Sequence, residues 1–449
     1  MRPYALENYF KLKENGTNFK TEIMAGITTF LAMAYILGVN PTMLAEGHMP
    51  ATGVFFATAI SAGIASIVMG LVSKYPIGLA PGMGLNALFT YTIILTMGNS
   101  WQTALAAVFI ASIIFLIITI SGLRESILDI IPLDLKLGIG AGIGFFLAFI
   151  GLKGGGIIIK NQSTFVTMGN LLSAPALLTL IGIIIALILY VKKVPASIFN
   201  GLIITAIIGI IFTIFGFGVG EIGMPTLPTQ IISTNFDTTL FCGFIQGFKG
   251  LFSNISNLIM ILFSLVFVTF FDTAGTLISL GKQCGFVDEN GTAQGIEKAF
   301  MGDAISGIIG SICGTSTVTA FVESATGIGL GGRTGLTAIV TGILFILSIF
   351  FSPIVLSLFT SSVTASALVI VGILMIVQLK EVNWDNIAVA SSVFMIIIMM
   401  LLTYSISVGI AWGFLIYVIT TLAMGKSEEL NWGIYLLVII FVLYLFFGL

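Results

Sequence analysis

The sequence predicts an all-α polytopic membrane protein whose two halves form an inverted repeat. Three observations predict it: the composition, a series of long apolar segments, and a similarity between the two halves of the chain. Of the 449 residues, 57% are hydrophobic and only 8% are charged, whereas a typical soluble domain has about 25% charged residues. So few charged side chains cannot cover the surface of a soluble protein of this size, and lipid is the predicted solvent.

Composition also argues against several other classes of protein. The net charge of −2 does not fit a nucleic-acid-binding protein, which needs a basic face. The apolar runs are continuous rather than alternating, which disfavours a β-barrel. The sequence contains neither a metal-ligand cluster nor a nucleophile–base pair, so we expect no metal, no cofactor and no enzymatic activity.

Fourteen segments have the roughly 17–25 mostly apolar residues that a spanning helix needs. In chain order they are 22–40, 53–73, 77–97, 103–121, 133–152, 173–191, 196–217, 255–280, 297–313, 316–332, 334–352, 361–379, 386–404 and 406–424. A further apolar segment, 432–449, follows a short polar break, and we expect it at the surface or periphery of the bundle.

The distribution of basic residues supports this number of spans. Basic residues gather on the cytoplasmic side of membrane proteins. With the N-terminus in the cytoplasm, 14 of the 17 lysines and arginines fall on that side, and the exceptions are Lys153, Lys160 and Lys249. The 14 are Arg2, Lys11, Lys13, Lys20, Lys74, Arg124, Lys136, Lys192, Lys193, Lys282, Lys298, Arg333, Lys380 and Lys426. We therefore expect a multi-pass protein of the cell membrane with a cytoplasmic N-terminus.

The two halves of the chain, 1–235 and 236–449, are related to each other. When the sequence is shifted by 245 residues, 55–96 aligns without a gap with 300–341, and serines and glycines fall in register. A weaker echo relates Phe30–Tyr35 to Phe267–Asp272. Each half holds seven spans, and because seven is odd, the second half enters the membrane from the opposite side. Such a 7+7 inverted repeat is typical of secondary transporters.

The third and tenth spans cannot be regular helices along their whole length. The third begins with two prolines and three glycines within 75–86, and the tenth is rich first in β-branched residues and then in glycine. Each is predicted to be a short extended segment followed by a half-helix that starts near Met83 or Ile328. Two such breaks at matched positions of an inverted repeat indicate a substrate site, although a glycine hinge without a ligand is the simpler alternative.

Three acidic residues lie within the predicted spans and not at their ends: Asp272, Asp303 and Glu323. A charge inside the membrane is costly, so such residues are functional by default. Asp272 is deep in the eighth span and Glu323 lies in the extended break of the tenth. A carboxylate without a basic partner there favours its protonated form, so both are candidates for proton coupling. Asp303 lies closer to the membrane–water interface. Capping or pairing near Lys298 explains a carboxylate at this position as well as a functional role does.

Two further polar residues accompany these acids. Asn86, one turn into the third-span half-helix, offers both a donor and an acceptor, although it could instead bond a neighbouring helix. Thr276 lies one turn from Asp272 on the same helix face. Two carboxylates without an arginine repel an anion, and together with an amide they suit a neutral molecule with N–H donors. A nucleobase fits, and so does a small polar amide.

Three motifs in this order resemble the AzgA-like purine permeases: Ala80–Asn86, Phe270–Leu277 and Gly314–Gly327, followed by Gly331–Leu336. These permeases are related to the nucleobase–ascorbate transporters, which include the bacterial uracil permease. The resemblance implies fourteen spans in a core domain (spans 1–4 and 8–11) and a gate domain (spans 5–7 and 12–14). It also implies that short strands in spans 3 and 10 cross beside the substrate.

The resemblance further implies proton symport of adenine, guanine or hypoxanthine. The predicted substrate-binding residues are Asn86, Asp272, Thr276, Val322 and Glu323, of which Asp272 and Glu323 would also couple the cation. Where the uracil permease branch carries a histidine, this chain has Thr276, which favours the purine branch. Relatives also imply a homodimer through the gate domain.

Several alternatives stay open from the sequence alone. The cargo could be xanthine, uracil or, as in sulfate permeases, an anion, although this chain lacks a basic site residue. Sodium could replace the proton as the coupling ion, because carboxylates and carbonyls also bind sodium. A channel or a membrane-embedded enzyme is a possibility of another class.

Overall fold

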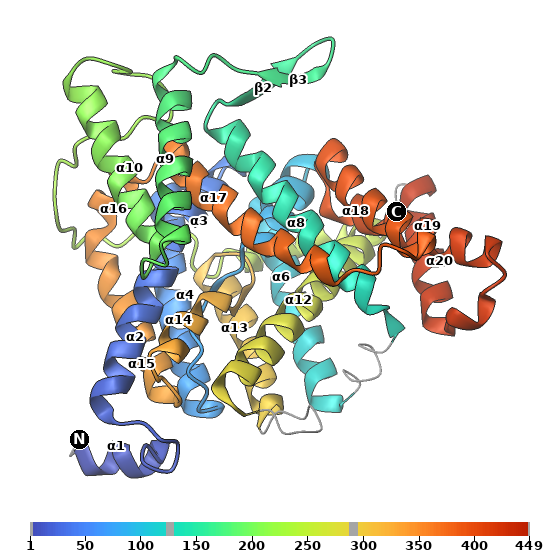
Figure 1. Cartoon of the computed structure of the whole chain (residues 1–449), viewed down its shortest axis with the longest axis horizontal. Helices are drawn as coiled ribbons and strands as arrows, with labels where there is room; N and C mark the ends of the chain where they lie inside the picture. Colours follow the sequence, from blue (N-terminus) through green and yellow to red (C-terminus); the bar gives the residue numbers. More distant parts are fainter. Residues whose placement is uncertain (1–2, 123–129, 287–294, 448–449) are drawn as a thin grey trace.

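The computed structural model describes residues 3–122, 130–286 and 295–447, and this part of the chain is mostly helical (Figure 1). Arg2 and Arg124, two of the basic residues predicted to be cytoplasmic, lie outside the described residues. The elements of the first half are α1 Pro3–Phe10, α2 Phe19–Met33, α3 Ile36–Glu46, α4 Ala51–Val72, β1 Leu79–Pro81, α5 Met83–Ala87, a π-helix Leu88–Thr96, α6 Trp101–Ser121, α8 Leu133–Gly154, β2 Ile158–Asn161, β3 Phe165–Met168, α9 Ala174–Val191 and α10 Ser197–Ile214.

The second half repeats the alternation of long helices with one broken segment. Its elements are α11 Phe244–Phe252, α12 Ile255–Cys284, α13 Ile296–Cys313, β4 Val318–Ala320, a 3₁₀ turn Val322–Ser324, α14 Ala325–Gly329, α15 Gly335–Leu347, a 3₁₀ turn Ser348–Phe351, α16 Ser352–Leu358, α17 Ser361–Ile376, a 3₁₀ turn Val377–Glu381, α18 Ile387–Thr403, α19 Ile406–Ala423, a 3₁₀ turn Ser427–Glu429 and α20 Trp432–Phe447.

The helices follow the predicted apolar segments closely. Among the described residues, ten helices are long and apolar enough, by length and composition, to cross a membrane, and three apolar helices are shorter. The first of the ten, Phe19–Glu46, contains α2 and α3, which are separated at Ala34 and Tyr35. The short helix α11 and the antiparallel hairpin of β2 and β3 were not predicted. The fold is thus a polytopic membrane bundle.

The most extensive helix packing falls into two groups. In the first, α15 packs on α2 and α4, while α13 packs on α4 and α6, and α6 also contacts α11 and α12. In the second, α17 packs on α8, α9 and α10, while α18 packs on α8 and α19, and α19 contacts α20. In Figure 1, α9 and α10 lie at one end of the second group and α18–α20 at the other, with α8 and α17 running between them.

Glycines bring helices of each group into close contact. A Cβ atom added at Gly342 of α15 would lie 2.5 Å from the carbonyl oxygen of Gly63 in α4. In the second group, a Cβ atom added at Gly372 of α17 would lie 2.5 Å from the carbonyl oxygen of Gly144 in α8. Any side chain at these positions would push the backbones apart, so the glycines permit the close helix approach that is common in membranes.

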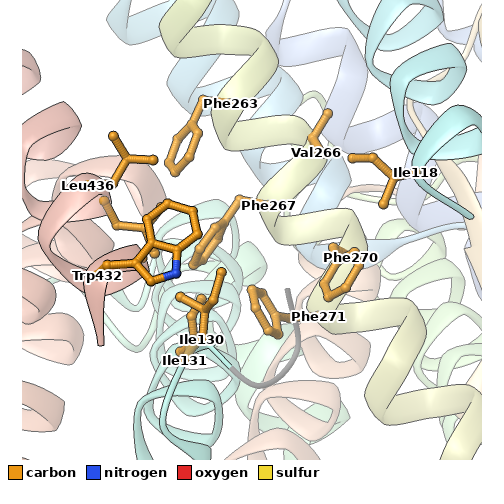
Figure 2. A pocket seen from close by; sticks show the side chains of 12 residues that line it. Ile118, Ile130, Ile131, Phe263, Val266, Phe267, Phe270, Phe271, Trp432 and Leu436 are labelled. Carbon is orange, nitrogen blue, oxygen red and sulfur yellow. The ribbon is translucent and has the colours of Figure 1, made fainter. Parts of the chain in front are cut away.

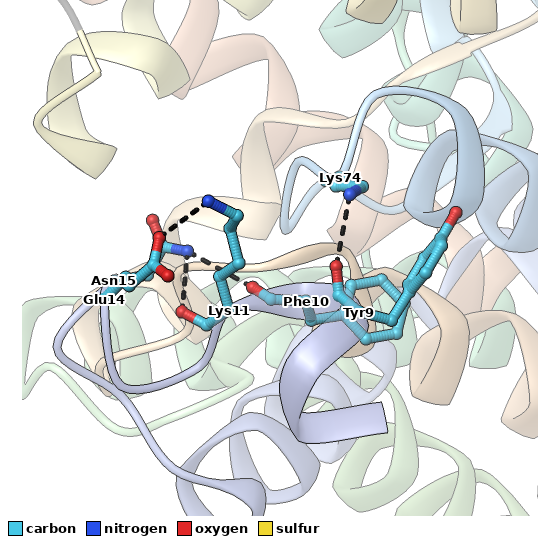
Figure 3. A network of polar contacts seen from close by, with 6 residues as sticks. All are labelled: Tyr9, Phe10, Lys11, Glu14, Asn15 and Lys74. Carbon is cyan, nitrogen blue, oxygen red and sulfur yellow. Dashed lines mark hydrogen bonds and ion pairs between the residues drawn. The ribbon is translucent and has the colours of Figure 1, made fainter. Parts of the chain in front are cut away.

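The N-terminal segment is attached to one end of the first group. The Lys74 ammonium donates to the carbonyl oxygen of Tyr9 at 3.1 Å (Figure 3), and the Tyr9 hydroxyl donates to the carbonyl oxygen of Leu71 at 3.2 Å. Further along, the Thr17 hydroxyl donates to the carbonyl oxygen of Gly331 at 3.1 Å. The segment therefore joins the end of α4 to the turn before α15.

The helix α20 lies at the edge of the bundle. Phe441 is buried on one side of it and contacts the rings of Phe263, Phe267 and Phe414. On the other side Ile439 is 57% exposed. One face of the expected peripheral segment is thus packed against α12 and α19, and the opposite face is open.

Candidate functional site

The two broken segments meet in the middle of the first group. Strands β1 and β4 pair antiparallel, with Leu79 opposite Ala320 and Pro81 opposite Val318. The expected extended segments are therefore present and cross each other. In the first segment the half-helix begins at Met83, as predicted, but in the second it begins at Ala325 rather than Ile328. The difference arises because a 3₁₀ turn follows β4, whereas a single residue separates β1 from α5.

Buried serine hydroxyls satisfy the backbone of the two strands. The Ser66 hydroxyl accepts from the Leu79 N–H at 2.8 Å and donates to its carbonyl oxygen at 3.1 Å. On the other strand the Ser306 hydroxyl donates to the carbonyl oxygen of Val318 at 2.7 Å. Irregular backbone at membrane depth needs such partners, because no lipid group can provide them. These serines hold both strands in place.

Asp303 braces strand β4 from behind. Its carboxylate accepts hydrogen bonds from the Thr273 hydroxyl at 2.7 Å, the Thr319 hydroxyl at 3.1 Å and the Ala320 N–H at 2.7 Å. The residue is only 1% exposed. Its partners thus come from α12 and β4, whereas the sequence indicated Lys298 as a neighbour. A fully bonded, buried carboxylate of this kind positions the strand and does not face the opening described below.

Asn86 is placed in a similar way behind β1. Its side chain is fully buried, its Oδ1 accepts a hydrogen bond from the Ser316 hydroxyl, and its Nδ2 donates to the carbonyl oxygen of Pro81 at 3.4 Å. It therefore connects the end of β1 to the segment that leads into β4. This is the bonding role that the sequence left open, although Pro81 and Ser316 are the partners rather than a neighbouring helix.

Asp272 faces the start of α5 from the neighbouring helix α12. A Cβ atom added at Gly82, the residue before α5, would lie 3.5 Å from Asp272 Oδ2. Asp272 is partly exposed, whereas Thr273, the next residue, is buried and bonds Asp303. The N-terminus of a helix carries positive potential that favours a negative group. Helix α12 thus presents Asp272 to the start of α5 and the next residue, Thr273, to Asp303.

Glu323 lies in the 3₁₀ turn after β4, not in the extended segment itself, which corrects the sequence-based placement. The Tyr35 hydroxyl donates to its Oε1 at 2.6 Å. Tyr35 is 1% exposed and lies at the interruption between α2 and α3. We did not predict Tyr35 as a site residue. The signal was present, because the weak echo of the repeat places Tyr35 at the position of Asp272.

The two carboxylates lie near each other beside the crossed strands, at partly exposed positions that we call the opening. Asp272 and Glu323 are close enough to interact electrostatically, and α12 contacts both the 3₁₀ turn and α14. Val322 is 48% exposed and Thr276 is half-buried. A Cβ atom added at Gly275, on the same helix, would meet no atom within 4 Å. Of the five predicted residues, Asp272, Thr276, Val322 and Glu323 are therefore at least partly exposed, and Asn86 is buried.

Besides Tyr35, one buried acid was missed. Glu22 is fully buried, and its carboxylate accepts from the backbone N–H groups of Arg333 at 2.8 Å and Thr337 at 3.1 Å. The Arg333 guanidinium donates to the carbonyl oxygen of Ile328 at 2.6 Å. Glu22 therefore caps α15 and Arg333 caps α14. The sequence concealed this role, because Glu22 stands at the polar edge of the first span.

A cavity of about 230 Å³ lies near this site but is separate from it. Figure 2 shows its apolar side chains, from α6, α12 and α20 and the residues before α8. Asp272 and Glu323 are not among its lining residues. Its lining offers almost no polar group, and recognition of a polar solute requires several. This cavity is therefore not the place where the carboxylates would bind a ligand.

Comparison with known proteins gives one consistent result. A model described as "Permease family" matches residues 20–412. The guanine/hypoxanthine permease PbuG of Bacillus subtilis is 45% identical over 98% of this chain and 100% of its own length. The adenine permease AdeQ of Escherichia coli is 38% identical over 95% of this chain and 93% of its own length.

The structural comparison concerns the fold alone. The transmembrane domain of the cyanobacterial bicarbonate transporter BicA superposes with a TM-score of 0.62, at 16% identity, over 86% of this chain and 96% of that domain. At this identity the likeness extends to the arrangement of the helices and not to the cargo.

Proposed function

We infer the function from the premise that this chain belongs to the permease family whose model matches residues 20–412. It is a nucleobase transporter rather than an enzyme. We propose purines as its cargo, because PbuG and AdeQ, named for guanine, hypoxanthine and adenine, match nearly its whole length. The observation that carries the proposal is the pair of carboxylates, Asp272 and Glu323, at one opening beside the crossed strands.

The roles that we propose follow from these positions. Asp272 and Glu323 accept the N–H groups of the base, and they carry the coupling proton when no base is bound. Thr276 and Val322 line the same opening, and Tyr35 orients Glu323 through its hydrogen bond. Asn86 supports the site from behind by holding β1. Among the described residues, neither carboxylate forms an ion pair with a lysine or arginine, which favours a neutral base over an anion.

We also propose the finer architecture: fourteen spans in a 7+7 inverted repeat, with the N-terminus in the cytoplasm of the cell that bears it. The first packing group would be the core domain and the second the gate domain, and the crossed strands belong to the core. The separation of the helix contacts into these two groups supports the division. The family resemblance also leads us to expect a homodimer through the gate domain. The mass of the protein in lipid nanodiscs would test this oligomeric state.

Alternating access would follow from movement of the core against the gate. In the proposed orientation, the exposed positions Gly275 and Ser279 lie on the cytoplasmic side of Asp272, so the opening faces inward. On the proposed extracellular side, a polar cluster at the helix ends joins the two packing groups. The Lys153 ammonium of α8 lies 4.0 Å from Glu46 Oε2 of α3.

Two tyrosines complete this outer cluster. The Tyr91 hydroxyl, from the π-helix, donates to Glu46 Oε1 at 3.0 Å. The Lys153 ammonium donates to the hydroxyl of Tyr404, between α18 and α19, at 3.2 Å, and the Tyr91 and Tyr404 rings are in edge contact at 5.3 Å. The cluster thus connects α3 and the π-helix to α8 and to the residues between α18 and α19, and we propose that it keeps the outer side closed in this conformation.

Weakening the outer cluster is expected to open the outer side more often. Replacing Lys153 by Met removes its contacts with Glu46 and Tyr404, and bonds of this kind contribute about 0.5–1.5 kcal/mol. A cysteine at Ser361, which lines a small cavity beside Glu46, should then react roughly two- to tenfold faster with an impermeant thiol reagent added outside. The background for this test is a functional chain without Cys242, Cys284 and Cys313.

Lys160, which is exposed on the hairpin, provides the matched control. Its replacement by Met removes the same charge from the same side and should leave the labelling rate unchanged. An unchanged rate in the Lys153→Met variant would contradict the closing role of the cluster.

The function itself is tested by uptake and competition. Cells or vesicles with the protein should accumulate labelled hypoxanthine in a saturable way, and unlabelled adenine or guanine should compete for it. Competition by unlabelled xanthine or uracil would indicate that the protein takes one of these alternative cargoes. A proton uncoupler should abolish accumulation, whereas dependence on a sodium gradient with no effect of the uncoupler would replace the proton by sodium. Failure of every nucleobase to enter or compete would overturn the assigned cargo.

A further inference from the structure

The cavity of Figure 2 lies between the two packing groups. It is lined by aromatic and aliphatic side chains and one glycine, and the residues that matter below are Ile118, Val266, Phe267, Phe271, Trp432, Leu436 and Leu437. One wall is α12, from the first group, and the opposite wall is α20, from the second. Nothing in the function proposed above uses this space.

The lining chemistry restricts what the cavity can hold. A water molecule needs two to four polar partners to stay in a cavity, and apolar cavities remain dry. A polar solute needs several well-placed polar groups, which this lining lacks. A void of this size without an occupant would lose many dispersion contacts along its walls. The occupant is therefore apolar and flexible enough to follow the space between the rings.

The mouth of the cavity faces the surface on which lipid would lie. Two lining residues of α20, Trp432 and Leu436, are 75% and 48% exposed. On α6, Ile117 and Ile120 are also exposed, next to the lining residue Ile118. Because these side chains are apolar and exposed, an acyl chain that lies along them can enter the cavity without crossing any polar layer.

Charged and amphipathic groups lie beside the cavity where a lipid headgroup would be. The Lys136 ammonium lies 5.7 Å from the centre of the Phe271 ring, which is part of the lining. Asp134, an acidic residue of the same helix, accepts the Asn383 N–H at 2.8 Å through its carboxylate. Exposed tryptophans such as Trp432 gather at the level of lipid headgroups. A phosphate beside Lys136 and a chain in the cavity fit this arrangement.

We propose that this cavity is a binding site for one acyl chain of a membrane phospholipid. The chain would lie between α12 and α20, and its phosphate would lie toward Lys136. Since Phe271 directly precedes Asp272, the bound chain contacts the same stretch of α12 that carries the substrate carboxylate. The proposal concerns binding of lipid and does not depend on the identity of the cargo.

The test is photolabelling of the full chain in nanodiscs with a phosphatidylcholine that carries a diazirine on one acyl chain. Phe267 is the diagnostic residue, because it lines the cavity but is only 7% exposed. Label on Phe267 and on Leu437 is expected. If label is found on exposed α20 residues such as Ile439 and never on Phe267, the cavity does not take an acyl chain and the proposal is wrong.

A pair of variants sharpens the result. Val266→Phe fills the cavity and should abolish the label on Phe267, whereas Ile439→Phe adds the same bulk on the open face of α20 and should leave it unchanged. Persistent labelling in the Val266→Phe variant would place the chain elsewhere. If this variant does not fold, the labelling pattern of the unaltered chain still decides the question.

Discussion

Uptake of purine is expected to be lost when Glu323 is replaced by Gln, while the protein still inserts and folds. The amide keeps the size of the side chain and can still accept a hydrogen bond from the Tyr35 hydroxyl. It cannot carry a negative charge or take up a proton. A hydrogen bond to a charged group contributes about 1.5–3 kcal/mol, so binding alone should weaken roughly 10- to 100-fold, and the loss of the coupling proton should remove accumulation altogether.

Two measurements separate these effects. Binding of labelled hypoxanthine to purified protein reports the loss of affinity, and uptake against a proton gradient reports the loss of coupling. Glu428→Gln neutralises an exposed acid in the 3₁₀ turn before α20 and should change neither. Gradient-driven uptake at the unaltered rate by the Glu323→Gln variant would show that Glu323 has no role in coupling.

Replacing Asp303 by Ala is expected to have the largest effect on stability. The substitution leaves the Thr273 hydroxyl, the Thr319 hydroxyl and the Ala320 N–H without their shared acceptor in a buried place. Each unsatisfied buried donor costs about 1–3 kcal/mol, so a loss of roughly 3 kcal/mol or more is expected. Strand β4 should lose its position, and uptake should fall with it, because Glu323 follows Ala320 by only three residues.

Thermal unfolding of the detergent-solubilised protein measures this effect. Asp303→Asn keeps one oxygen acceptor and should give an intermediate loss. Asp385→Ala removes an exposed aspartate, and surface substitutions of this kind usually change stability by less than about 0.5 kcal/mol. A melting temperature for Asp303→Ala equal to that of Asp385→Ala would mean that the carboxylate does not brace the strand.

Several of the long helices could be predicted well because lipid imposes a simple rule on composition. A helix in a membrane must be apolar over its whole length, so α4, α6 and α8 begin and end within two residues of the segments predicted for them. The crossing of β1 and β4 could be anticipated in outline, since prolines and glycines exclude a regular helix there. The start of α14 was misplaced because the ungapped repeat ignores the 3₁₀ turn after β4.

The bracing contacts could not be predicted in the same way. The partners of Asp303 come from two elements, and those of Glu22 follow it by more than 300 residues. No local pattern encodes such pairs, because they depend on how the helices pack. Tyr35 is an intermediate case. The sequence similarity between the two halves pointed to its position, but only the fold shows that its hydroxyl donates a hydrogen bond to Glu323.

The pairing of β1 with β4 also sets an order of events during synthesis. Leu79 leaves the ribosome long before Ala320, its partner in the strand pair. At about 5–20 residues per second, the first strand waits roughly 12–50 s for the second. Until then its backbone groups near Gly78 and Gly82 lack the partners that they find in the finished protein. The site is therefore incomplete until translation supplies the second strand.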